Sequence, residues 1–252
     1  MSETAGRERR VEGEAGNRKG SEAMAGIVVV DYGLGNLRSV TRGLERAGAA
    51  VEISADPDFE SADGVVLPGV GAFREGVENA GPYREALIAA AERGTPIFGI
   101  CLGMQMLLTT SEEADTTGQG DVTGLDLIPG TNVRFGDDRK VPHMGWNELS
   151  VEREHPLVEG IDRTEGVGAG SDRGDGPAGG SVDGEYAYFV HSYYAVPEKD
   201  EAVVATTDYG TEFASVIANP EGTVFGTQFH PEKSGETGLK ILRNFVDICA
   251  GE

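Results

Sequence analysis

The feature that most constrains this chain is a buried strand that turns sharply into a helix at a cysteine, within residues 95–108 (T-P-I-F-G-I-C-L-G-M-Q-M-L-L). A short apolar run ends at Cys101, Gly99 and Gly103 stand two residues to either side, and an apolar pattern with helical spacing follows. The pattern G-x-C-x-G predicts a nucleophile elbow, where glycines are needed because a Cβ would clash in so tight a turn. The start of a helix also stabilises a thiolate, which is the form of cysteine that attacks carbonyl carbon.

A histidine and a glutamate far downstream supply the partners that such a thiol needs. Residues 226–234 read G-T-Q-F-H-P-E-K-S, so His230 and Glu232 point to the same side of an extended segment. The imidazole can take the thiol proton, and the carboxylate can hold the ring in the useful tautomer. We therefore predict a catalytic triad of Cys101, His230 and Glu232. The alternative is that Cys101 is a small buried hydrophobe, which is the usual role of an isolated cysteine.

Two other histidines are weaker candidates. His191 lies in the aromatic stretch 186–194 (Y-A-Y-F-V-H-S-Y-Y) and could compete as the base, but it lacks a carboxylate two residues on. His143 has no second histidine at metal-ligand spacing, so we expect it to be structural. No motif in the sequence predicts a metal site.

The elbow and the H-P-E segment together resemble the class I, triad-type glutamine amidotransferases. Four further stretches resemble one branch of that class, the glutaminase subunits of imidazole glycerol phosphate synthase: D-Y-G-L-G-N-L-R-S-V (31–40), L-P-G-V-G-A-F (67–73), K-V-P-H-M-G-W-N (140–147) and the lysine in H-P-E-K-S. The similarity covers residues 26–250. The elbow is specific only to the class, whereas the combination is specific to the branch.

The resemblance assigns further site residues. It implies that the L-P-G-V-G segment is an oxyanion strand, in which the peptide at Gly69–Val70 reorients so that the N–H groups of Val70 and Leu102 hold the oxyanion. It implies glutamine contacts at Gly71, Gln105, Glu113, Ser192 and Tyr193, the last two through the backbone. Taken alone, Gln105 would be a surface glutamine and Glu113 a solvated charge. It also implies that Trp146, Tyr188 and Lys233 face a partner subunit.

The implied reaction is the hydrolysis of glutamine to glutamate and ammonia, with no cofactor. The ammonia passes to a (β/α)₈-barrel cyclase subunit, which forms imidazole glycerol phosphate and an aminoimidazole carboxamide ribotide in histidine biosynthesis. The expected assembly is a heterodimer. The alternatives are the glutaminase of another branch, such as anthranilate or pyridoxal phosphate synthesis, and a catalytically inactive interaction subunit. The branch motifs argue against the former, and the intact Cys, His and Glu against the latter.

The sequence pattern predicts one α/β domain over residues 26–252. Strands alternate with helices in the first half and cluster in the second, which predicts a mainly parallel central sheet flanked by helices, with an antiparallel extension, as in flavodoxin-like folds. Residues 1–25 are polar and without periodicity, and residues 164–185 are rich in Gly, Asp and Ser, so we expect a disordered extension and a flexible insertion. Met24 immediately precedes residues 25–33 (A-G-I-V-V-V-D-Y-G), so Met1 and Met24 are both candidate translation starts.

The chain has no apolar run near the roughly 20 residues that span a bilayer, and no secretory signal follows the N-terminal arginines. Its two cysteines form no C-x-x-C pair, which is typical of a reduced compartment. We therefore expect a cytoplasmic protein. A net charge of −22 argues against a nucleic-acid groove.

The same charge predicts a dependence on salt. Acidic residues are in excess, and lysine is scarce beside arginine, with 5 against 16, as expected for a salt-rich cytoplasm. At molar salt the Debye length falls to about 3 Å, which screens the self-repulsion. We expect the secondary structure, followed by circular dichroism, and the activity to decrease when the salt is removed. Full structure and activity in dilute buffer would rule this out and favour an ordinary acidic protein.

Overall fold

The computed structural model describes residues 24–115, 122–161 and 185–251. The predictions of a disordered extension and of a flexible insertion therefore lie almost entirely outside the described residues. The two edges of those segments are described, and both belong to the fold. Ala25 is buried and its carbonyl accepts a hydrogen bond from Ala50 N. Glu185 accepts a hydrogen bond of 2.6 Å from the Thr237 hydroxyl and pairs with Lys240.

Five parallel strands form the centre of the main sheet, in the order β2-β1-β3-β4-β13. They are β1 (Gly26–Val30), β2 (Ala50–Ser54), β3 (Gly64–Gly69), β4 (Ile97–Cys101) and β13 (Val224–Thr227). Every residue of β3 and β4 is buried, which explains their continuous apolar runs, since both faces of the sheet are covered. β13 comes late in the chain but pairs directly with β4, so it brings residues 228–232 next to the elbow.

The sheet continues beyond β13 as an extension with antiparallel pairing, except at its far edge, where the last short strand is parallel to its neighbour. The order is β12 (Glu212–Ala218), β10 (Tyr193–Pro197), β6 (Gly130–Arg134) and the edge strand β5 (Thr110–Ser111), while β11 (Val203–Asp208) and β8 (Ser150–Val151) lie off this path. A separate antiparallel pair joins β7 (His143–Glu148) to β9 (Tyr186–His191). The predicted fold class, a mainly parallel sheet with an antiparallel extension, is confirmed.

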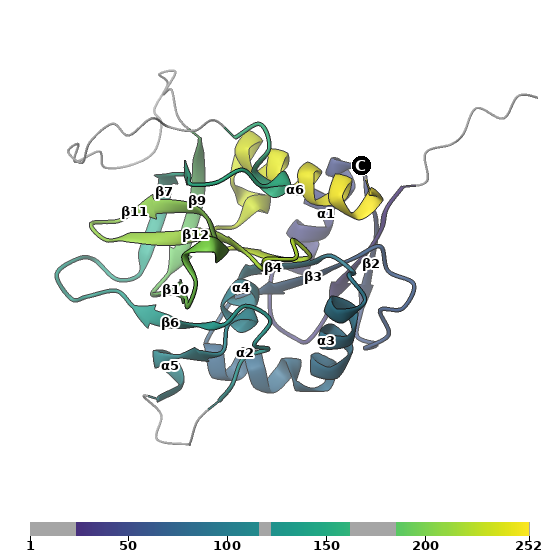
Figure 1. Ribbon diagram of the computed structural model, residues 1–252, viewed down its shortest axis with the longest axis horizontal. Helices are drawn as coiled ribbons and strands as arrows, with labels where there is room; N and C mark the ends of the chain where they lie inside the picture. The colour runs from purple at the N-terminus through teal and green to yellow at the C-terminus, as the bar shows by residue number, and fades with distance from the viewer. Residues whose placement is uncertain (1–23, 116–121, 162–184, 252) are drawn as a thin grey trace, which may run out of the picture.

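Helices cover both faces of the parallel strands (Figure 1), and one apolar core lies on each face. On one face α1 (Leu37–Ala47) packs against α6 (Gly235–Ala250), and their buried side chains share a cluster that contains Cys101. On the other face lie α2 (Phe73–Ala80) and α3 (Arg84–Glu92), whose buried side chains share a second cluster with Leu102. The remaining elements are α4 (Leu102–Leu107), α5 (Glu112–Asp115) and the short 3₁₀ turns η1 (Gly81–Tyr83), η2 (Pro156–Val158), η3 (Asp200–Ala202) and η4 (Pro231–Lys233). Among the described residues, no helix is long and apolar enough to cross a membrane.

Several helix starts lack the local features that usually mark them. Asn36 and Ser234 precede α1 and α6, but neither side chain caps its helix. Pro82 lies within η1, and α3 begins at Arg84, directly after that turn. The aromatic stretch 186–194 is two strands, β9 and β10, which separate at Ser192 because they join different sheets.

Candidate active site

The elbow is the point at which β4 ends and α4 begins, and its backbone is strained. Cys101 has φ 55° and ψ −109°, a conformation that a residue with a side chain rarely adopts. Such strain persists only where the surrounding structure enforces it, and it is common at catalytic nucleophiles. The Cys101 side chain is 6% exposed. The turn therefore holds the sulfur in one place at the carboxyl end of a central strand.

Close backbone approaches explain the two glycines of the elbow. A Cβ on Gly103 would stand 1.8 Å from the Leu67 carbonyl oxygen, and one on Gly99 would stand 2.7 Å from Met104 N. Both close approaches are to backbone atoms, of β3 in the first case and of α4 in the second, which cannot rotate aside as the end of a side chain can. The elbow thus requires glycine on both sides of Cys101, as the sequence predicts.

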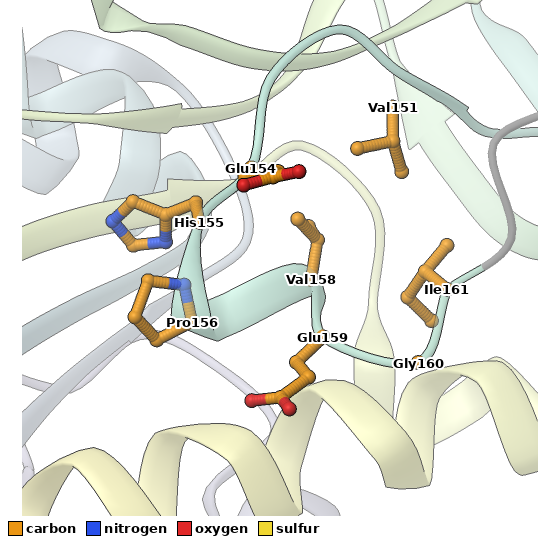
Figure 2. Close-up of a pocket in the computed structure, with 8 residues that line it drawn as sticks. All are labelled: Val151, Glu154, His155, Pro156, Val158, Glu159, Gly160 and Ile161. Carbon is orange, nitrogen blue, oxygen red and sulfur yellow. The ribbon is translucent and has the colours of Figure 1, made fainter.

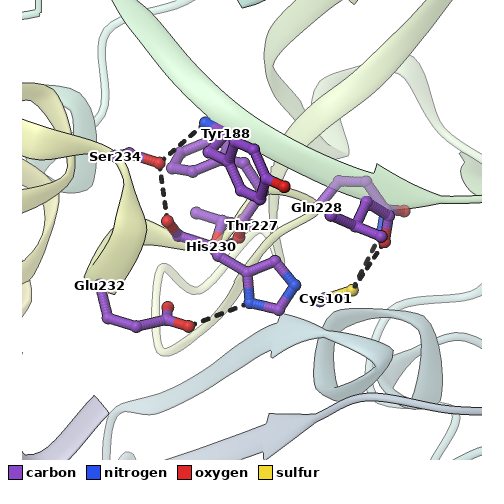
Figure 3. Close-up of polar contacts among 9 residues, drawn as sticks. Cys101, Tyr188, Thr227, Gln228, His230, Glu232 and Ser234 are labelled. Carbon is purple, nitrogen blue, oxygen red and sulfur yellow. Dashed lines mark hydrogen bonds and ion pairs between the residues drawn. The ribbon is translucent and has the colours of Figure 1, made fainter. Parts of the chain in front are cut away.

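The structure brings Cys101, His230 and Glu232 together (Figure 3). His230 Nδ1 lies 3.1 Å from Glu232 Oε1, and both side chains are almost fully buried. The opposite edge of the ring faces Cys101. Burial by itself would lower the pKa of His230, but the hydrogen bonds and negative charges of Cys101 and Glu232 outweigh it and raise that pKa to about 9. The ring is therefore a cation at neutral pH.

Backbone contacts with β9 hold the histidine loop. His230 N donates to the Tyr188 carbonyl at 3.0 Å. The buried Ser234 hydroxyl donates to the His230 carbonyl at 2.6 Å and accepts from Tyr188 N at 3.0 Å, so one side chain bridges the loop and the strand (Figure 3). Ser234 directly precedes α6, and its position in the sequence gives no sign of this bridging role.

Gln228 is a second polar residue that the sequence reading missed. Its side chain is fully buried, its Nε2 lies 3.9 Å from Cys101 Sγ, and its Oε1 accepts from Gln105 Nε2 at 3.3 Å (Figure 3). Its position could have identified it, because a residue two positions before His230 points to the same side of an extended segment. Gln228 presents a neutral donor to the sulfur from the side away from Glu232.

The predicted glutamine contacts surround this centre. Gln105 is buried rather than on the surface, and its Nε2 donates to the Tyr193 carbonyl at 2.9 Å. Glu113 is half-buried, and its Oε2 accepts from Phe73 N at 2.7 Å, so the alternative of a solvated surface charge is wrong. The Ser192 carbonyl is engaged with Phe135 N. Whether these residues contact glutamine stays a prediction.

The predicted oxyanion donors lie at the ends of two paired strands. Gly69 of β3 is directly opposite Cys101 of β4, so Val70 and Leu102 are the residues that follow a matched pair. Leu102 is buried, Val70 is 40% exposed, and Gly71 has φ 115°, a left-handed conformation that favours glycine. The segment after β3 therefore leaves the sheet beside the elbow, with a turn built on Gly71.

Two neutral histidines form a chain next to the triad. His191 Nδ1 lies 2.8 Å from the Tyr193 carbonyl, which can only accept, so His191 Nε2 carries no proton and accepts from His143 Nδ1 at 3.0 Å. Burial lowers the pKa of His191 to about 3 and that of His143 to about 4. Both nitrogens of His191 are engaged, so it cannot serve as the base. Among the described residues, no three His, Cys, Asp or Glu side chains gather as a metal site.

The three predicted partner-facing residues lie on the β7–β9 sheet and on η4. Trp146 and Tyr188 are register partners whose rings meet edge to face at 5.9 Å. Trp146 is 42% exposed and the neighbouring Met144 60%, while Lys233 is exposed beside the triad. An exposed tryptophan and methionine on one strand pair are more typical of an interface than of a solvated surface.

A cavity of about 460 Å³ lies elsewhere, around η2 (Figure 2). Its lining comes from β8 and residues 154–161 and includes none of the predicted site residues. We assign no part of the chemistry to it.

Comparison with solved structures supports the fold. The chain is similar to PurLQS from Thermotoga maritima, with a TM-score of 0.67, 21% identity, and coverage of 89% of this chain and 99% of that one. It is also similar to the glutaminase domain of Trypanosoma brucei CTPS with bound acivicin, with a TM-score of 0.58, 15% identity, and coverage of 91% and 95%. At these identities the likeness shows a shared fold.

Comparison with known sequences shows the family. The profile described as glutamine amidotransferase class-I matches residues 28–249. Imidazole glycerol phosphate synthase subunit HisH of Haloarcula marismortui is 72% identical over 229 residues, which cover 90% of this chain and 97% of the relative. HisH of Natronomonas pharaonis is 68% identical over 230 residues, which cover 91% and 97%. These halophilic relatives agree with the salt adaptation predicted from the charge. The chain belongs to the class I glutamine amidotransferases, in the branch formed by subunit HisH of imidazole glycerol phosphate synthase.

Proposed function

We propose that this chain hydrolyses glutamine through a Cys101–His230–Glu232 triad and delivers the ammonia to a cyclase subunit. The observation that carries the proposal is a strained, buried cysteine facing a histidine whose far nitrogen is bonded to a buried glutamate. An inactive interaction subunit would have no need to maintain the strain at Cys101 or the burial of Glu232. We place the reaction in the cytoplasm, where the free thiol stays reduced.

The chemistry follows from the protonation of the pair. The Cys101 thiolate attacks the side-chain amide carbon of glutamine and forms a tetrahedral oxyanion. His230, a cation at neutral pH, gives its proton to the departing ammonia as the C–N bond breaks, and a thioester remains. Neutral His230 then takes a proton from water, whose oxygen attacks the thioester, and glutamate and the thiolate are released. Glu232 keeps Nδ1 protonated, so that Nε2 handles both transfers.

The oxyanion needs donors that are in place before the reaction. We assign this role to the N–H groups of Leu102, the first residue of α4, and of Val70, where the peptide after Gly69 turns toward the sulfur. Losing one such donor typically costs about 10²–10³ in rate. Gln105, Glu113, Gly71 and the backbone of Ser192 and Tyr193 hold the glutamine.

Ammonia that escapes to water is protonated and diluted, so its consumer has to dock over the site. We propose that the face carrying Trp146, Tyr188 and Lys233 binds a (β/α)₈-barrel cyclase in a heterodimer. Tyr188 connects that face to the triad, because its carbonyl and N–H hold the loop of His230. A partner that moves β9 therefore acts on the catalytic histidine.

Co-expression with the cyclase subunit of the same organism tests this function. The two chains should purify together in molar salt, and glutamate release should be slow for the chain alone and much faster in the complex with cyclase substrate bound. Glutaminase activity that is equal with and without the partner would refute the coupling. The absence of glutamate release in the complex would refute the reaction itself.

Glu232→Gln should change the pH dependence of the reaction. Because the carboxylate helps to raise the pKa of His230 to about 9, its loss lowers that pKa. The wild-type rate is expected to decline as the pH rises through about 9, where His230 loses the proton that ammonia needs. In the variant this limb moves to lower pH, and kcat at neutral pH falls on the order of 10²–10⁴-fold. Profiles of kcat and of kcat/KM between pH 6 and pH 10 measure the two effects, and an unmoved limb would contradict the assignment of Glu232.

A further inference from the structure

The segment D-Y-G-L-G-N, at residues 31–36, follows β1 and has no part in the mechanism above. Its tyrosine is nonetheless buried, with 5% of Tyr32 exposed. The Tyr32 hydroxyl donates to the carbonyl oxygen of Pro68 at 2.5 Å. Pro68 immediately precedes Gly69, whose following peptide supplies the proposed oxyanion donor Val70. Residues 31–36 therefore contact the proposed oxyanion strand, β3, on the side opposite β4.

The strand pairing explains why Pro68 needs a side-chain partner. β1 pairs with β3 only as far as Val29 and Val66, whereas β4 pairs with β3 up to Gly69. The last residues of β3 thus have a neighbouring strand on one side only. On the other side the Tyr32 hydroxyl satisfies the buried Pro68 carbonyl, where a continuing β1 would have supplied a backbone N–H.

The same hydroxyl also touches the proposed oxyanion segment. A Cβ on Gly69 would stand 2.6 Å from the Tyr32 oxygen, 2.8 Å from Gly103 N and 2.8 Å from the Leu102 Cβ. Gly69 is therefore confined between the tyrosine hydroxyl and the elbow. Gly35 adds a second contact, since a Cβ there would lie 3.3 Å from Pro68.

We propose that Tyr32 is a positioning residue for the oxyanion strand: by binding the Pro68 carbonyl, it confines the reorientation of the backbone to the single peptide between Gly69 and Val70. This inference rests on the proposed glutaminase function. With the Pro68 carbonyl held, the next peptide can turn without displacing β3, so the Val70 N–H arrives at one defined position. Without the hydroxyl, the buried carbonyl is unpaired and the whole segment is free to shift. A misplacement of about 1 Å in such a group can cost 10²-fold in rate.

The ionisation of Tyr32 is compatible with this role. Burial, and then the negative charge of Cys101, raise its pKa well above its ordinary value. The hydroxyl therefore remains a donor at every pH at which the enzyme works.

Tyr32→Phe in the complex with the cyclase subunit tests the inference, and Tyr83→Phe is the matched control. Tyr83 is 7% exposed, and its hydroxyl donates to the Asp31 carbonyl at 2.8 Å and lies 3.1 Å from the Ala55 carbonyl, so the control also deletes a buried hydroxyl bonded to backbone in the same region. We expect Tyr32→Phe to lower kcat for glutamate release about 10- to 100-fold, with KM within about twofold, since an oxyanion donor acts mainly in the transition state. Tyr83→Phe should keep the wild-type kcat.

A second measurement separates the oxyanion strand from the thiol. Iodoacetamide alkylates a thiolate by direct displacement and forms no oxyanion, so the alkylation rate of Cys101 should be the same in wild type and Tyr32→Phe. An unchanged alkylation rate would also show that the Tyr32→Phe variant is folded. Equal losses of alkylation and hydrolysis would mean that Tyr32 acts on Cys101 or on folding, and would overturn the inference. So would an unchanged kcat, or an equal loss in Tyr83→Phe. A wild-type complex without glutaminase activity would instead overturn the proposed function, and the inference with it.

Discussion

Replacing Cys101 by alanine is expected to abolish glutamate release, by on the order of 10⁶-fold, because no other group can form the thioester. The same complex, supplied with cyclase substrate and with ammonium at high pH, should still form the cyclase products, since ammonia is all that the proposed partner takes from this chain. The two assays, glutamine-dependent and ammonia-dependent, are run on one preparation in molar salt. Loss of the glutamine-dependent reaction together with retention of the ammonia-dependent reaction would show that the Cys101→Ala chain is folded and bound to its partner.

Cys249→Ala is the matched control. Cys249 is half-buried on α6, its sulfur packs against Gly64, and burial raises its pKa to about 12. It is therefore an inert core thiol, and its variant should keep full glutaminase activity. Residual glutamine hydrolysis in Cys101→Ala at even a hundredth of the wild-type rate would contradict the covalent mechanism.

Gly103→Ala is expected to have the largest effect on stability. The added Cβ would stand 1.8 Å from the Leu67 carbonyl oxygen, a backbone atom in the middle of the sheet. Relief requires moving α4 away from β3, which breaks the packing of buried side chains at the elbow. We expect a loss of more than about 4 kcal/mol in the free energy of unfolding, a size that is exceptional for one methyl group. Denaturant titration at constant molar salt, followed by circular dichroism, measures it.

Gly81→Ala provides the comparison. Gly81 has a right-handed helical conformation with φ −48°, and no atom lies within 4 Å of the position of its Cβ. The same chemical change should be neutral there, or stabilising by about 0.4–1 kcal/mol. If Gly103→Ala and Gly81→Ala were equally stable, the close approach of α4 to β3 would not be the reason for glycine in the elbow.

Signals that are local in sequence predicted much of the fold and of the site. The apolar runs of β1, β3 and β4 identify buried strands, because both faces of the parallel sheet are covered. The spacing of G-x-C-x-G identifies the elbow, because a sharp turn forbids a Cβ at the flanking positions. His230 and Glu232 are recognisable as a pair because they are two positions apart, so their hydrogen bond depends only on the local backbone.

The residues that the sequence reading missed bond to partners that are distant in the chain. Gln228 meets Cys101 across 127 positions, and Tyr32 meets Pro68 across 36. Ser234 looks like a helix cap, yet its hydroxyl bridges His230 and Tyr188, 46 positions away. The hydrophobic periodicity of the sequence does not predict such contacts, because they depend on which strands become neighbours.

Local chemistry therefore settled the elbow, the strand-and-helix pattern and the pairing of imidazole with carboxylate, since each involves groups a few bonds apart along the backbone. The insertion of β13 between β4 and β12 was decided only in three dimensions, and it carries His230 to the sulfur. The tertiary structure also decided that the pairing of β1 with β3 ends at Val29, so the Pro68 carbonyl accepts a hydrogen bond from the Tyr32 hydroxyl instead. The physical reason is that strand order depends on the packing of the whole core and on the hydrogen bonds that buried backbone groups require. No single segment of the sequence determines either of these.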